Sequence, residues 1–332
     1  MSVTLKDIAE ATGFSINTVS RAMRGDTHLS ENTRSLIRKT AAEKEYIPNA
    51  IASSMRSAHS KIVGVITADS SNLFFSEVSK GIEEMAGKIG YHILLGSTEE
   101  SVKKEQELVK MFLSRRVDAL VVMPVFDNSE EHLELYRQLD IPFVFPGRYL
   151  TGLESHSILH GDYLGQKQVF DHLLDNGHKR ILYLAGPAKV SNTHDRLQGL
   201  RSSYAEHGLA VDPEYILEAG GHIEDGYALV NQALNRGMNF TAVACFNDMV
   251  AMGVLKSLSE NDLRVPRQIE VFGYDNLYMS QFMQPSLSTV DVPKFRLGYS
   301  AMELLYKHIQ NPETPYVKQE IPTRLVYRET TR

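Results

Sequence analysis

The stretch Val3–Met23, VTLKDIAEATGFSINTVSRAM, contains two short helical patterns that are separated by one glycine. Thr4 and Asp7 have the spacing of a capping box, with a hydroxyl at the N-cap and an acid three residues later. Gly13 breaks this first helix, and Ser15 is a suitable N-cap for the next one. Two short helices joined by a tight turn are typical of a helix-turn-helix unit.

The second helix, from Ile16 to about Met23, is expected to have an apolar and a polar face. The apolar face would hold Val19, Ala22 and Met23. The opposite face would hold Ile16, Asn17, Ser20 and Arg21. A third helix is expected from about Ser30 to Glu45. The second helix of such a unit enters the major groove and presents its N-terminal residues to base edges.

The polar face of the second helix has the side chains that base recognition needs. Arg21 could donate two hydrogen bonds to guanine, Asn17 could pair with adenine, and Ile16 could contact a thymine methyl. Four hydroxyl side chains could contact phosphates and fix the register: Thr4, Ser15, Thr18 and Ser20. The alternative is a small three-helix bundle whose polar residues are simply solvated.

The segments Val3–Ala9, Ser15–Met23, Thr33–Arg34 and Tyr46–Asn49 resemble the head of the lac repressor family (LacI/GalR). The resemblance implies that Ile16, Asn17 and Arg21 read bases.

Residues 49–56, NAIASSMR, follow Pro48, which is expected to end the third helix. This segment is too short to persist as an isolated helix. The resemblance implies a hinge helix that orders on DNA, with Asn49, Ala52 and Met55 as DNA contacts. Met55 stands where the family usually has a leucine wedge between base pairs. The alternative is a flexible tether.

From Lys61 onward, short apolar runs alternate with amphipathic stretches. Strands are expected at Ile62–Ile66, Tyr91–Leu95, Ala119–Met123, Pro142–Phe145, Arg180–Leu184, Tyr215–Leu217, Ala242–Phe246 and Glu270–Tyr274. Helices are expected at about Val102–Ser114, Gly165–Asn176, Arg196–His207, Glu224–Asn235 and Met249–Glu260. This alternation favours two similar α/β lobes with parallel sheets and a ligand site between them.

Several segments of the body resemble motifs of the same family, which shares the fold of class I periplasmic sugar-binding proteins: Gly177–Ile181, Asp195–Gly199, Phe246–Asp248 and Val271–Asn276. The predicted fold is therefore an all-α helix-turn-helix head joined by a hinge helix to a two-lobed, periplasmic-binding-protein-like α/β body. The expected domains are a head at 1–47, a hinge or linker at 48–60 and an effector-binding domain at 61–332. The N-lobe would cover about 61–160 and 291–321, and the C-lobe about 162–289 and 323–332, with crossovers near Gly161, Val290 and Pro322.

Polar side chains at the carboxyl ends of strands are candidates for binding an effector. By family position, Arg196, Asn247 and Asp275 would contact it, with Arg196 opening a helix. Weaker candidates from the same resemblance are Asn72, Phe74 and Asp162. The chain has no tryptophan, so an aromatic face would have to come from Phe74, Tyr149 or Tyr163.

Some polar residues near these strand ends could have structural roles, and one departure from the family pattern concerns the effector. Asp248 and Asn276 could instead cap helices, and Asp275 could merely hold a turn. Gly147 stands where many relatives carry an acid or asparagine, so the effector could differ or the cleft could be roomier.

Composition excludes several classes of protein. The single cysteine, Cys245, lies in an apolar run and is expected in the core, and it permits no disulfide framework. The histidines show no HExxH pattern, so no metal is expected, and no cofactor motif such as Walker A or GxGxxG follows a strand. No GxSxG elbow indicates hydrolase chemistry. Without a signal-peptide pattern or an apolar run of about 18 residues, the chain is expected in the cytoplasm.

Charge is distributed unevenly along the chain. Residues 1–60 carry eight Lys and Arg against six Asp and Glu, although the whole chain has a net charge of −6. A mildly basic head on an acidic body agrees with a DNA reader that carries a separate sensor.

These observations predict a homodimeric transcription regulator, a repressor, that binds a palindromic operator and responds to a small-molecule effector, a sugar or sugar derivative. A purine- or nucleoside-responsive corepressor-type regulator is the alternative. A sugar solute-binding protein and an enzyme remain as lesser alternatives.

Overall fold

The computed structural model describes residues 3–47 and 59–332, which fall into two compact units divided between Ser60 and Lys61. The predicted DNA contacts Asn49, Ala52 and Met55 lie outside the described residues and stay predictions.

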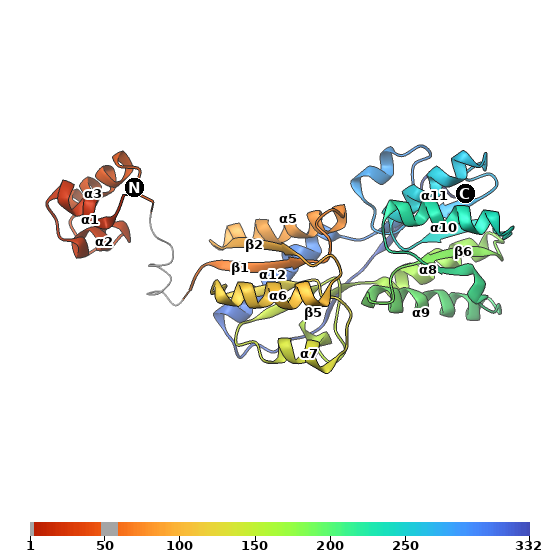
Figure 1. Ribbon diagram of the computed structural model, residues 1–332, viewed down its shortest axis with the longest axis horizontal. Helices are drawn as coiled ribbons and strands as arrows, with labels where there is room; N and C mark the ends of the chain where they lie inside the picture. Colours follow the sequence, from red (N-terminus) through yellow and green to blue (C-terminus); the bar gives the residue numbers. More distant parts are fainter. Residues whose placement is uncertain (1–2, 48–58) are drawn as a thin grey trace. The chain divides into compact units, whose positions relative to one another are not determined.

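The first unit contains three helices, α1 (Leu5–Thr12), α2 (Ile16–Met23) and α3 (Glu31–Glu43), as Figure 1 shows. Each helix contributes a fully buried aliphatic side chain to one small core, respectively Ile8, Val19 and Ile37.

Local sequence signals start and stop the first two helices as predicted. The Asp7 N–H donates to Thr4 Oγ1 and the Thr4 N–H donates to Asp7 Oδ2, which completes the capping box of α1. Gly13 ends α1 with φ at 72°, and the Ser15 hydroxyl accepts a hydrogen bond from the Thr18 N–H at the start of α2. The helix-turn-helix geometry therefore depends on short-range contacts.

The second unit has two lobes, each built on a parallel sheet. The N-lobe sheet has six strands in the order β11-β5-β4-β3-β1-β2. Its strands are β1 (Ile62–Thr67), β2 (His92–Ser97), β3 (Ala119–Val122), β4 (Phe143–Pro146), β5 (Ser157–His160) and β11 (Gln319–Ile321). Its helices are α5 (Leu73–Lys88), α6 (Val102–Ser114), α7 (Glu130–Arg137) and α12 (Lys294–Gln310), with the 3-10 helix η1 (Glu154–His156) before β5.

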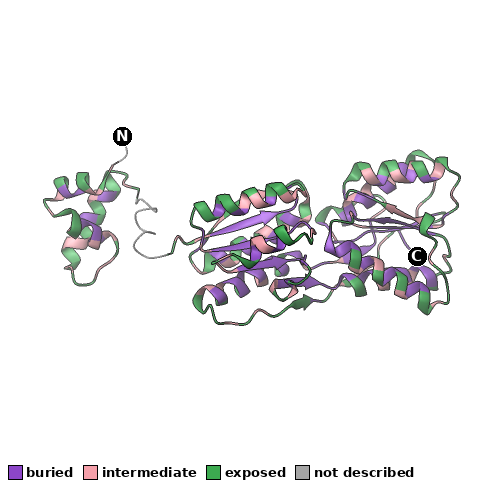
Figure 2. Ribbon diagram, turned by 60° about the horizontal axis from the view of Figure 1, so that its bottom comes forward, coloured by how far each residue is buried: buried purple, intermediate pink, exposed green. Residues whose placement is uncertain are grey.

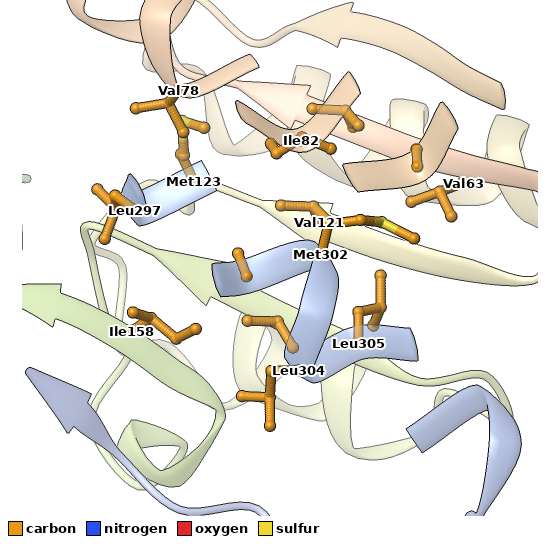
Figure 3. Packing of buried hydrophobic residues seen from close by; sticks show 14 of the residues in the cluster. Val63, Val78, Ile82, Val121, Met123, Ile158, Leu297, Met302, Leu304 and Leu305 are labelled. Carbon is orange, nitrogen blue, oxygen red and sulfur yellow. The ribbon is translucent and has the colours of Figure 1, made fainter. Parts of the chain in front are cut away.

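Helices cover both faces of the N-lobe sheet, so its central strands β1, β3, β4 and β5 are buried while the outer helix faces are exposed (Figure 2). On one face, Val63 and Val121 of the strands pack against Ile82 of α5 and Met302 of α12, as Figure 3 shows. On the other face, residues that alternate with these along the strands pack against α6 and α7.

α5 and α12 approach each other with almost no side chain between them. A Cβ added to Gly298 would lie 1.9 Å from the Val78 carbonyl oxygen, and one added to Gly81 would lie 2.1 Å from the Phe295 carbonyl oxygen. Only glycine permits this backbone contact, which holds the two helices together as one layer.

The C-lobe sheet has four parallel strands in the order β7-β6-β8-β9. Its strands are β6 (Ile181–Ala185), β7 (Ile216–Glu218), β8 (Ala242–Cys245) and β9 (Glu270–Phe272). Its helices are α8 (Asp162–Asp175), α9 (Ser191–Glu206), α10 (Ile223–Asn235) and α11 (Asp248–Glu260), with 3-10 helices η2 (Pro213–Tyr215) and η3 (Tyr278–Phe282). α8 and α9 pack on one face of the sheet, and α10 and α11 on the other.

The chain passes between the lobes three times. It passes from β5 to α8 at Gly161, from β10 (Thr289–Asp291) to α12, and from β11 to β12 (Arg324–Val326). β10 and β12 form a two-stranded antiparallel pair, and bridges link Ser288 and Asp291 to the end of the C-lobe sheet.

The structure corrects two sequence-based expectations. The strand β5 was not predicted, although all four of its residues are buried. α9 begins at Ser191 rather than Arg196, so Arg196 lies inside the helix and does not open it. Within the described residues, no helix is long and apolar enough to span a membrane, and no group of three or more potential ligands could hold a metal ion.

Candidate functional site

The exposed face of α2 carries most of the predicted DNA contacts of the head. Ile16 is 50% exposed although it is aliphatic, and Asn17 beside it is exposed as well. An apolar side chain exposed at a helix N-terminus suits contact with a thymine methyl. The prediction for Ser20 was wrong in one respect, because its side chain is buried in the head rather than exposed with its neighbours.

Arg21 is half-exposed and forms an ion pair within the head. Its Nε donates to Asp26 Oδ2 at 2.7 Å, and the Arg21 side chain remains 37% exposed. The pair holds the guanidinium beside the polar face of α2, where it remains accessible. The other predicted phosphate contacts, Thr4, Ser15 and Thr18, lie at the N-termini of α1 and α2 and are exposed or partly exposed.

A cavity of about 700 Å³ lies between the two lobes of the body. Five of the six predicted effector residues line it: Asn72, Phe74, Arg196, Asn247 and Asp275. The sixth, Asp162, lies behind Arg196. The lining comes from loops that follow the carboxyl ends of strands in both lobes, as expected for ligand sites in parallel α/β sheets.

Arg196 is buried between two aromatic rings and two oxygen acceptors. Its Cζ lies 3.5 Å from the Tyr274 ring centroid and 4.8 Å from that of Phe246. Nε donates to Asp162 Oδ1 at 2.6 Å, and Nη1 donates to the Phe246 carbonyl. Only Nη2 lacks a partner among the described residues, so the guanidinium is held rigidly with one nitrogen available to a ligand.

Asp162 supplies the negative charge that Arg196 needs in this buried position. Burial by itself would raise the pKa of Asp162, but the nearby His160 and Arg196 lower it to about 2. Asn192 donates to the second carboxylate oxygen at 2.5 Å, so both oxygens of Asp162 are used. Asp162 therefore positions Arg196 and does not face the cavity itself.

Asp275 lines the cavity without a hydrogen-bond partner for its carboxyl group among the described residues. The side chain is 5% exposed, and burial raises its pKa to about 8 despite the nearby Arg196. Its φ is 106° and that of Asn276 is 51°, conformations that are strained for residues other than glycine. Such a strained and unsatisfied acid in a cavity is a strong candidate for a ligand contact.

Lys294, at the start of α12, holds this strained turn in place. Its buried ammonium donates to the carbonyls of Asp275 at 2.5 Å, Asn276 at 3.1 Å and Val292 at 3.3 Å. The same nitrogen lies 3.7 Å from Glu77 Oε2 on α5. Lys294 thus links the Asp275 turn of the C-lobe to the α5–α12 layer of the N-lobe.

Asn247 caps α11, a role that the sequence pattern offered for its neighbour Asp248. Its side chain caps α11 by accepting from the Val250 N–H at 2.8 Å, and it donates to the Gly221 carbonyl at 2.9 Å. Asp248, the predicted cap, is instead buried and accepts from the hydroxyls of Ser280 and Thr289.

Two other asparagines clarify the capping alternative. Asn276 is not a helix cap, because it bonds to Asp291 and Arg328. Asn72 caps α5 by accepting from the Phe74 N–H at 2.9 Å. For Asn72 and Asn247, capping and effector contact are therefore both compatible with the position.

Phe74 is the one predicted stacking residue that lines the cavity. Its ring lies 5.9 Å from the ring of His160, which lines the cavity too. The other two alternatives, Tyr149 and Tyr163, are not among the lining residues, and their hydroxyls donate to Asp195 and Ser202. Phe246 supplies a second aromatic ring that was not predicted.

Gly147, which stands where many relatives carry an acid or asparagine, lies at the cavity wall beside Arg148. Gly147 has φ at 74°, so its lack of a side chain fits a left-handed turn at the cavity wall. Arg148 donates through both terminal nitrogens to Glu100, at 2.9 and 2.7 Å. Sequence reasoning missed this pair because its members are 48 residues apart.

Direct hydrogen bonds join the lobes beside the cavity. The Phe126 N–H donates to the Lys189 carbonyl at 2.9 Å, and Asn192 donates to the Gly147 carbonyl at 2.8 Å. The N-lobe loops therefore dock on the N-terminal part of α9, which also carries Arg196.

Comparison with known proteins identifies the family. Residues 4–49 match the model of bacterial regulatory proteins of the lacI family, and residues 170–331 match a periplasmic binding protein-like domain. The HTH-type transcriptional repressor PurR of Vibrio campbellii is 32% identical over 330 residues, covering 99% of this chain and 98% of that protein. The chain belongs to the lacI family of bacterial regulatory proteins.

Other lacI-family members agree with this assignment. The ribose operon repressor of Haemophilus influenzae is 30% identical and covers 98% of each chain. The lac repressor dimer bound to operator and the anti-inducer ONPF superposes with a TM-score of 0.89 at 27% identity, over 99% of each chain. A complex of the regulator CelR with cellobiose, at 22% identity and a TM-score of 0.75, shares the fold. The predicted family, fold class and role as a DNA-binding transcription regulator are confirmed.

Proposed function

We propose that this protein represses transcription as a homodimer on a palindromic operator and that a sugar or sugar derivative in the cavity between its lobes controls it. The observation that carries the effector assignment is that one cavity is lined both by Arg196, whose Nη2 is available, and by Asp275, whose carboxyl group has no hydrogen-bond partner among the described residues. A hydroxyl can accept from the first and donate to, or accept from, the second. Phe74 and Phe246 offer apolar surface for the face of a sugar ring.

In the head, Arg21, Asn17 and Ile16 would read bases, while Thr4, Ser15 and Thr18 would contact phosphates. Ser20 would do so only if its side chain turned outward. The proposed hinge contacts are Asn49, Ala52 and Met55. Two heads in a symmetric dimer would read two half-sites of a palindrome.

Exposed apolar side chains on both lobes support a homodimer. β2 is an edge strand of the N-lobe sheet, yet Leu94 and Leu95 on it are 37% and 52% exposed. On the C-lobe, Tyr278 and Phe282 of η3 are exposed, with ring centroids 5.1 Å apart. Uncovered edge strands and aromatic patches are usually buried by a partner. Light scattering after gel filtration should give twice the mass of one chain.

A purine or nucleoside effector is the second candidate, and the 32% identity to a PurR repressor favours it. The two candidates separate in a thermal-shift screen of neutral sugars against purine bases and nucleosides. A specific ligand that binds the folded state raises the melting temperature in proportion to the logarithm of its concentration. A saturable shift by a sugar supports the proposal, and a shift by purines alone would replace it with the second candidate.

The operator can be found by selection from random duplex DNA, followed by footprinting of the enriched sequence. We expect a protected palindrome at physiological salt, and its absence would contradict the proposal for the head. Neither proposal involves catalysis, so we expect any sugar that binds to be recovered chemically unchanged after incubation with the protein.

A further inference from the structure

The charges around the cavity do not balance. Five acidic side chains line it: Asp69, Glu99, Glu100, Glu218 and Asp275. The basic side chains of the lining are Arg148, Lys189 and Arg196, with two histidines, His160 and His222. A narrow site with an excess of acids repels anions, and a weakly hydrated interior strengthens that repulsion.

The two buried arginines of the lining are already neutralised by protein carboxylates. Arg148 places both terminal nitrogens on Glu100, and Arg196 is paired with Asp162 at 2.6 Å. The Arg148–Glu100 pair is bidentate, and Arg196 keeps only Nη2 for a ligand, so few arginine donors remain for a ligand anion. Lys189, the remaining base, is exposed at the rim.

The Arg148–Glu100 pair is built at a conformational cost. Glu99 and Glu100 have φ values of 51° and 56°, so two successive residues adopt the left-handed region without being glycine. Strain of this kind persists only where the surrounding structure enforces it. It places the Glu100 carboxylate on Arg148, where a ligand anion could otherwise bind.

Asp275 adds an acid that no protein group compensates by hydrogen bonding in the described part of the chain. Its side chain is 5% exposed and lines the cavity. Because burial raises its pKa to about 8, it is mostly protonated at neutral pH, and a nearby anion would raise that pKa further. A protonated carboxyl group is a hydrogen-bond donor and acceptor for a hydroxyl.

From these contacts we infer that the effector cavity selects against phosphate and carboxylate groups, so that its ligand is an uncharged or amine-bearing molecule rather than a phosphorylated one. The inference rests on the proposed function, since it assumes that this cavity is the effector site. A phosphate monoester carries a charge of about −1.5 to −2 at neutral pH and would meet no buried arginine that lacks a carboxylate partner among the described lining residues.

The first test uses inorganic phosphate as the probe. Wild-type protein in about 20 mM phosphate should melt at the same temperature as in chloride of equal ionic strength, because no ligand-linked stabilisation is available. The variant Glu100→Gln removes the charge that occupies Arg148 and should acquire a saturable stabilisation by phosphate. A saturable shift in the wild type would overturn the inference.

Two further variants guard against loss of folding and against general charge effects. Asp275→Asn breaks no side-chain hydrogen bond in the described part of the chain. Above pH 8, where the wild-type carboxyl group is ionised, this variant should acquire a weaker stabilisation by phosphate. Glu107→Gln, on the exposed surface of α6 outside the cavity, should acquire none. If both cavity variants behave like Glu107→Gln, the charges of the lining do not exclude anions and the inference is wrong.

The second test compares D-ribose with D-ribose 5-phosphate and D-glucose with D-glucose 6-phosphate. Where the parent sugar binds, its phosphate should bind at least about tenfold more weakly. A phosphate ester that binds as tightly as its parent sugar overturns the inference. If no sugar binds and wild-type protein still ignores inorganic phosphate, the sugar part of the proposed function fails while the charge selectivity stands.

Discussion

Two arginines of this protein are paired with aspartates at nearly equal distances but lie in opposite environments. Arg21 Nε lies 2.7 Å from Asp26 in the head, and Arg196 Nε lies 2.6 Å from Asp162 in the body. The Arg21 side chain is 37% exposed, whereas that of Arg196 is 3% exposed. Distance alone therefore does not distinguish them, and burial does.

The difference explains the two roles. An exposed ion pair is weak, because water competes for both partners, so Arg21 can leave Asp26 for a base at little cost. A buried pair cannot open without leaving an uncompensated charge, so Arg196 is a fixed part of the cavity wall. Recognition of DNA needs the first kind of arginine, and a preorganised effector site needs the second.

The largest effect should come from breaking the buried pair. Asp162→Asn leaves Arg196 without its counter-charge and should lower the free energy of unfolding by about 3–5 kcal/mol. Because the pKa of Asp162 is lowered to about 2 from 3.8, its stabilisation is present above pH 4 and is lost as the pH falls toward 2. Urea denaturation at several pH values measures the free energy of unfolding and its pH dependence. The variant should lack the loss of stability between about pH 4 and pH 2.

Asp140→Asn, on an exposed turn, is the matched control for that substitution and should leave stability unchanged. Equal effects of the two substitutions would show that the Arg196–Asp162 pair is not special.

Arg21→Ala should act on DNA recognition without destabilising the body. We expect it to reduce discrimination between operator and mismatched DNA by about 1–3 kcal/mol at the base it reads. Competition binding with single-base variants of the selected operator measures this.

Arg196→Ala should retain operator binding and lose the response to effector. Loss of operator binding in that variant would contradict the separation of roles between the head and the body.

Asp275→Asn should stabilise the protein. The pKa of this group is raised to about 8 from 3.8, so the wild type loses stability as the pH rises between these values, while asparagine does not titrate. We expect a gain of at least about 1 kcal/mol at pH 7 in the absence of ligand. Thermal unfolding at pH 5 and pH 8 provides the check. If the gain in stability of the variant over the wild type is smaller at pH 8 than at pH 5, the predicted direction of the effect is wrong.

Asp26→Asn should have the smallest effect of these substitutions. Asp26 is accessible to solvent, and its lowered pKa reflects hydrogen bonds from Arg21 and the His28 N–H rather than burial. We expect little change in unfolding and slightly tighter DNA binding, because Arg21 is released. A large drop in melting temperature would mean that the head depends on this exposed pair.

Sequence reasoning succeeded where the contacts are local. The capping box of Thr4 and Asp7, the stop at Gly13 and the cap at Ser15 involve residues within three or four positions of each other, and all are present. The strands of both lobes were also predictable, because buried parallel strands are continuous apolar runs. β5 escaped prediction because its four residues, SILH, include two polar ones that are nevertheless buried.

The residue pattern was enough to define the head, the alternation of strands and helices and, through the family motifs, the strand ends that would meet at the cavity. The tertiary structure decided what each residue does there. It placed Asp162 behind Arg196, brought Asn247 against the Gly221 carbonyl and Glu100 against Arg148, and left the Asp275 carboxyl group without a hydrogen-bond partner among the described residues. The physical reason is that charge compensation and burial depend on groups tens of residues apart in the chain, and only folding brings those groups together.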